Sequence, residues 1–85
     1  MPPKPQAWKP MTPAEFVELI GSMGLSQLAV GRFLDVGGRQ VRRWVAGEVP
    51  VPFAVELLLT YMAAKNLTPA DVYKACEIDR PLGLV

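Results

Sequence analysis

The chain has 85 residues with a formal net charge of +1 at pH 7, and 51% of its residues are hydrophobic. This length predicts one domain, and the hydrophobic content excludes a disordered chain. With no histidine, and with Cys76 as the single cysteine, the chain lacks the usual general base, the commonest metal ligand and any internal disulfide. We therefore expect no cofactor, no metal site and no enzymatic activity.

Residues 1–11 are rich in proline and carry no periodic apolar pattern, which predicts a flexible or polyproline-like arm. This start lacks the apolar stretch that a signal peptide contains. No apolar run approaches the roughly 20 residues that a membrane-spanning helix needs. We expect a cytoplasmic protein without a membrane partner, with a domain over residues 12–78 and an apolar tail over residues 79–85.

The first predicted helix starts at Thr12-Pro13-Ala14-Glu15, because threonine caps a helix, proline suits its first position and glutamate completes a capping box. Apolar residues follow at the spacing of one helical face, at Phe16, Leu19, Ile20 and Met23. Gly24 ends this helix, since glycine adopts the left-handed cap conformation at little cost.

Two short helices are predicted next. Ser26 caps the first of them, whose inward face holds Val30, Phe33 and Leu34. A turn over residues 35–37 leads to the other helix, which begins near Gly38, ends at Gly47 and buries Val41, Trp44 and Val45.

The fourth predicted helix runs from about Pro52 to Lys65 and is apolar nearly all round, which is typical of a helix covered on both sides. Five residues are expected to face the core: Phe53, Leu57, Leu58, Tyr61 and Met62. Val55 and Leu59 lie off that stripe, so the next helix or another subunit would cover them. Thr68-Pro69-Ala70-Asp71 starts a fifth helix with the same capping chemistry, and the apolar tail is expected to pack, with a dimer interface as one candidate place.

Positive charge is concentrated between residues 27 and 46, which contain four arginines and one aspartate. Arg39, Arg42 and Arg43 are spaced to share the exposed face of the third helix. Gly31 is expected where the second and third helices approach most closely, because a larger side chain there would separate them. Small residues at the crossing, apolar contacts and a polar outer face are the requirements of a helix-turn-helix.

This segment resembles the lambda-repressor/Cro-type helix-turn-helix family, also called xenobiotic-response-element-like. The resemblance extends over roughly Thr12 to Ala64 and rests on Leu25-Ser26-Gln27, Val30-Gly31, Leu34, Val36, Val41, Trp44, Gly47-Glu48 and Pro50. It implies an all-α, compact five-helix lambda-repressor-like domain. The chain departs from the family pattern at Asp35, where glycine is usual, at Gly31, where alanine is commoner, and at Gly38, where family members often carry a base-reading side chain.

The resemblance also implies roles for individual residues. Ser26 and Gln27 would contact DNA phosphates at the positive end of their helix. Arg39, Arg42 and Arg43 would reach base edges, with guanine as the preferred base. Three positions complete the DNA-binding set: Gly38 would let the backbone approach DNA, Arg32 is a phosphate contact or a solvated charge, and Gln40 is a base reader or a helix surface residue.

The function expected from these features is that of a sequence-specific regulator of transcription, a repressor or autoregulator. It would bind a two-fold operator in double-stranded DNA as a homodimer through a recognition helix over residues 38–46. The alternative is a protein-interaction module, an antitoxin or antiactivator, that holds a protein partner with the fourth helix and the C-terminal tail.

Overall fold

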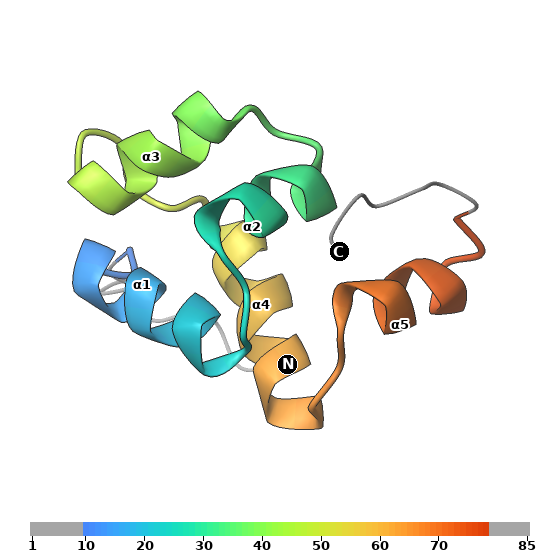
Figure 1. Ribbon diagram of the computed structural model, residues 1–85. Helices are drawn as coiled ribbons and strands as arrows, with labels where there is room; N and C mark the ends of the chain where they lie inside the picture. The colour runs from blue at the N-terminus through green and yellow to red at the C-terminus, as the bar shows by residue number, and fades with distance from the viewer. Residues whose placement is uncertain (1–9, 79–85) are drawn as a thin grey trace.

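The computed structural model describes residues 10–78, which form five α-helices and no strand. In chain order they are α1 (Pro13–Ser22), α2 (Gln27–Leu34), α3 (Gly38–Ala46), α4 (Phe53–Lys65) and α5 (Pro69–Ala75) (Figure 1). The all-helical prediction is confirmed for this part of the chain. The predicted tail over residues 79–85, and all but the last two residues of the predicted arm, lie outside the described residues.

The starts of α1, α2 and α5 are capped as the sequence predicts. The Thr12 hydroxyl accepts a hydrogen bond from the Glu15 backbone N–H at 3.1 Å, and the Thr12 N–H donates to the Glu15 carboxylate at 2.9 Å. Thr68 and Asp71 repeat this capping box at the same two distances, 3.1 and 2.9 Å. The hydrogen bond from the threonine backbone N–H to each carboxylate, followed by the interaction of the threonine hydroxyl with it, holds the pKa of Glu15 and that of Asp71 below their ordinary values.

A core of ten buried residues is assembled mainly from α1 to α4, and its members are Phe16, Ile20, Val30, Phe33, Val41, Trp44, Val51, Leu59, Met62 and Tyr73. Its centre is marked by the Phe16 ring of α1, which meets the Trp44 ring of α3 edge to face, with 5.9 Å between centroids. In Figure 1, α4 runs behind α2 with α1 on one side of it and α5 on the other, and α3 lies above α1. The predicted inward faces of α1, α2 and α3 are confirmed, because each apolar residue that was predicted to lie on them is buried or packs against this core.

The prediction for α4 is confirmed for its range and for Met62 and Leu58, which are buried or pack against the core, and is wrong for the rest of the inward face. Leu59, expected off the core stripe, is fully buried, and Val55 packs against the core beside it. Phe53, Leu57 and Tyr61 were expected inside, but their side chains are 39, 58 and 55% exposed. An apolar residue occupies nearly every position of this helix, so residues 55, 58, 59 and 62 satisfy the helical spacing as well as the expected set does. The packing of α4 against α1 selects the stripe that is buried.

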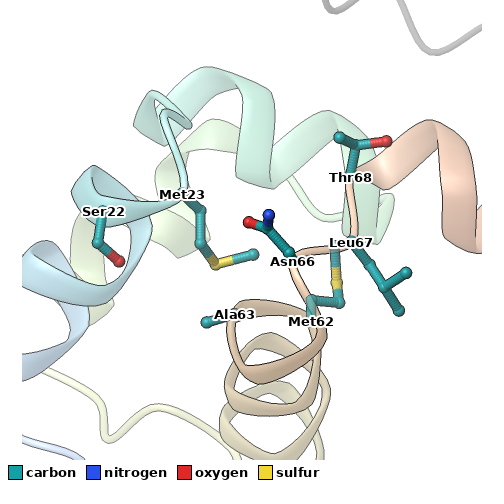
Figure 2. Close-up of a pocket in the computed structure, with 7 residues that line it drawn as sticks. All are labelled: Ser22, Met23, Met62, Ala63, Asn66, Leu67 and Thr68. Carbon is teal, nitrogen blue, oxygen red and sulfur yellow. The ribbon is translucent and has the colours of Figure 1, made fainter.

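α5 is joined to the rest of the domain by Tyr73, whose hydroxyl donates a 2.6 Å buried hydrogen bond to the Phe33 carbonyl. That carbonyl belongs to the last turn of α2, where helical N–H partners run out. Where the chain passes from α4 to α5, Asn66 adopts the left-handed conformation with φ 59°. Figure 2 shows Asn66 facing Met23, the residue that caps the end of α1, across a small hollow of about 140 Å³, with Met62 and Leu67 beside it.

Candidate nucleic-acid interface

α3 presents opposite faces to the core and to solvent. Val41 and Trp44 are buried, whereas Arg39, Arg42 and Arg43 are exposed at positions three and four residues apart. We call these three residues the arginine face. Because the apolar residues of α3 anchor the helix, the guanidinium groups on its other side are left available to an external partner.

The arginine face borders an open hollow of about 560 Å³, and Glu48 lies beside the three arginines in its lining. Glu48 reaches this place because Gly47 ends α3 with φ 78°, and the Glu48 N–H then donates to the Arg43 carbonyl at 3.0 Å. The sequence pattern identified Glu48 only as part of the helix exit. The turn chemistry at Gly47 is the signal that could have placed it beside the arginines.

The contact between α2 and α3 is as close as predicted. A Cβ at Gly31 would lie 3.2 Å from the Val36 carbonyl oxygen and 3.5 Å from Cγ2 of Val41. The Val36 N–H donates to the Gly31 carbonyl at 2.9 Å, and Asp35 adopts the left-handed conformation with φ 57°. Aspartate can occupy this position because it tolerates that conformation better than most residues. The orientation of α3 relative to α2 is therefore held by backbone contacts.

Gly38 is not required by packing. A Cβ there would meet only the end of the Arg42 side chain, with Nη1 3.3 Å away. One guanidinium group of the arginine face thus extends back over the first residue of α3. A flexible side chain of this kind can move aside, so the position is open from the solvent side.

The remaining predicted DNA contacts do not line the arginine hollow. Ser26 and Gln27 are exposed at the start of α2, Arg32 is exposed in its last turn, and Gln40 on α3 is half-buried. The Ser26 hydroxyl accepts from the Ala29 N–H at 3.0 Å, which leaves its own O–H able to donate to another group.

Charge is distributed unequally over residues 10–78. Residues 27–46 carry four arginines and one aspartate, a net charge of +3, whereas the rest of this range carries two lysines and six carboxylates, a net charge of −4. This part of the chain is therefore electrostatically asymmetric, with positive potential concentrated at α2 and α3. An anionic partner would be drawn to that side.

Comparisons of the chain with family models, with curated proteins and with solved structures found no match. Among residues 10–78, no helix combines the length and apolar character needed to cross a membrane. The same residues contain no cluster of three or more side chains suited to holding a metal ion.

Proposed function

We propose that this protein is a sequence-specific DNA-binding regulator in which α2 and α3 form a helix-turn-helix of the lambda-repressor type. The observation that carries the proposal is the arginine face, which lies on the helix whose opposite side is buried and whose angle is held at Gly31. This rigid presentation of positive side chains on one helix is what reading a DNA groove requires.

In the proposed complex α3 enters the major groove, whose width of about 12 Å accommodates an α-helix with its side chains. Arg39, Arg42 and Arg43 reach guanine O6 and N7 or the flanking phosphates. The start of α2 approaches the phosphate backbone, where the Ser26 O–H, the Gln27 amide and the free N–H groups of the first turn donate hydrogen bonds. Gly38 adds no side chain between the backbone of α3 and the base edges.

The proposed protein regulates transcription by occupying its operator. One recognition helix contacts only a few base pairs, so two copies would bind half-sites about 10 bp, or ~34 Å, apart on one face of the duplex. A bound dimer on a promoter excludes polymerase, which makes repression or autoregulation the expected outcome. Two arginine faces bound to two half-sites hold the operator more tightly than one arginine face on one half-site.

The test is selection from random duplexes followed by fluorescence anisotropy over a salt series. Arg42→Ala/Arg43→Ala should reduce affinity and lower the slope of log K against log salt by about 2 for each bound protomer, and so by about 4 for the dimer, one for each arginine contact removed. The matched control is Lys65→Ala/Lys74→Ala, which removes two exposed cations outside α2 and α3 and should leave the slope unchanged. No enriched sequence, or equal effects of the two double variants, would refute the proposal.

A second candidate function, a protein-interaction module, is favoured by the exposed apolar side chains of α4. The two functions respond to different changes. Charge reversal at Arg42 and Arg43 would abolish DNA binding and spare a protein partner. A charge at Leu57 would abolish binding of that partner and leave the α3 helix of one chain able to bind a single half-site.

A further inference from the structure

The outward side of α4 carries an apolar surface composed of Ala54, Leu57, Leu58 and Tyr61, which we call the α4 patch. These residues line a hollow of about 450 Å³ that contains almost no polar atoms. The opposite side of the same helix holds Leu59 and Met62, which are fully buried. α4 therefore has one apolar side packed in the core and a second one in contact with water, where apolar surface is unfavourable.

The chemistry of the α4 patch indicates what would cover it. None of its members is acidic or basic, and the one carboxylate and the one lysine of α4 lie off the patch: Glu56 is half-buried, and Lys65 is the last residue of the helix. An interface about a two-fold axis places a surface against itself, so any charge near the axis meets its own copy. An uncharged apolar surface is self-complementary in this respect, whereas the arginine face would oppose its own three positive charges.

The shape of the patch agrees with its chemistry. Leu57 and Tyr61 project from α4 with more than half of their side-chain surface exposed, and the hollow lies between them and Leu58. Its volume is sufficient to receive the corresponding side chain of a second helix. Ridges and hollows on one helix are the elements by which two helices pack.

We propose that a second copy of this chain packs on the α4 patch, α4 against α4 about a two-fold axis, with Leu57 of each protomer inserted beside Tyr61 of the other. The proposal deepens the proposed function, since such a dimer carries two arginine faces to one duplex, but the interface itself rests on α4 alone. Four residues on each side form a contact smaller than the roughly 1,600 Å² of a standard interface. The dimer is therefore expected to be reversible, with a dissociation constant in the micromolar range or weaker.

The test is sedimentation velocity of the full chain from about 1 µM to about 500 µM, a range that spans a micromolar dissociation constant. The wild-type protein should change from monomer to dimer within this range. Leu57→Glu should stay monomeric and helical by circular dichroism. The matched control is Leu28→Glu on α2, because Leu28 is 57% exposed and Leu57 is 58% exposed; this variant should dimerise like the wild type. Mixing Leu57→Glu with Tyr61→Lys should restore the dimer, since the glutamate of one protomer then meets the lysine of the other.

A wild-type chain that remains monomeric at all these concentrations would overturn the proposal, as would a Leu57→Glu variant that still dimerises. Capture of a different protein by a monomeric chain would likewise assign the patch to another partner. DNA binding separates this inference from the proposed function. A monomer that binds duplex DNA refutes only the α4 interface, and a dimer that loses its association with Leu57→Glu but binds no DNA refutes only the DNA-binding function.

Discussion

Replacement of Tyr73 by phenylalanine tests how α5 is held to the domain. The Tyr73 hydroxyl donates to the Phe33 carbonyl at 2.6 Å across 40 residues of sequence, and the Tyr73 side chain is only 9% exposed. The variant keeps the ring, whose centroid lies 5.6 Å from that of Phe33, but leaves a carbonyl of the last turn of α2 without its partner. Loss of one net hydrogen bond and burial of an unsatisfied acceptor cost about 1–2 kcal/mol.

For a domain of this size each kcal/mol lowers Tm by about 4–8 °C, so Tyr73→Phe should melt about 4 to 16 °C below the wild type. Urea unfolding followed by circular dichroism at about 1 µM, where association on the α4 patch is weak, should show a lower midpoint with an unchanged m-value. The control is Tyr61→Phe, because Tyr61 is 55% exposed. A free energy of unfolding for Tyr73→Phe within about 0.3 kcal/mol of that of the control would refute the assigned role of this hydrogen bond.

Three further predictions concern packing, binding and pH. Gly31→Val places a branched side chain 3.2 Å from a backbone carbonyl oxygen and should lower the free energy of unfolding, measured by urea titration, by about 1–3 kcal/mol. Gly21→Val is the control and should have a much smaller effect, because no atom lies within 4 Å of a Cβ at that position. Glu48→Gln removes the negative charge beside the arginine face and should tighten DNA binding about two-fold in anisotropy, since one charge at ~8 Å in water is worth about 0.5 kcal/mol. The pKa of Glu15 and that of Asp71 lie below their ordinary values of 4.5 and 3.8. The stability that these carboxylates contribute is therefore fully present at a pH above the ordinary pKa values, and it is lost as the pH falls through the lowered pKa of the folded state. Glu15→Gln/Asp71→Asn should therefore flatten the acid side of the stability–pH curve measured by urea unfolding.

Each of these predictions has a contrary result. Equal destabilisation by the two glycine variants would show that backbone contact at Gly31 does not control helix packing. Unchanged or weaker DNA binding by Glu48→Gln would show that the hollow beside the arginine face does not lie near the DNA phosphates. An acid side as steep in the double carboxylate variant as in the wild type would remove the capping boxes as its cause.

Much of the local structure could be predicted from the sequence because the interactions that determine it are close along the chain. Thr12 and Thr68 cap helices through residues three positions ahead, and Gly47 ends α3 because of its own backbone freedom. The exposure of Arg39, Arg42 and Arg43 follows in the same way, since α3 has apolar residues on one side only. The close contact at Gly31 could also be predicted from the sequence, because a short turn forces α2 and α3 together.

What only the tertiary structure decided depends on contacts between distant segments. α4 is apolar all round, so its periodicity could not show that Leu59 is buried and Leu57 exposed; packing against α1 made that choice. Tyr73 looks like any aromatic residue on a short helix until it meets a carbonyl 40 residues earlier. Glu48 lies beside the arginine face because Gly47 turns the chain at the end of α3. A residue pattern records local preference, whereas the partner that a residue meets is set by how the helices share one core.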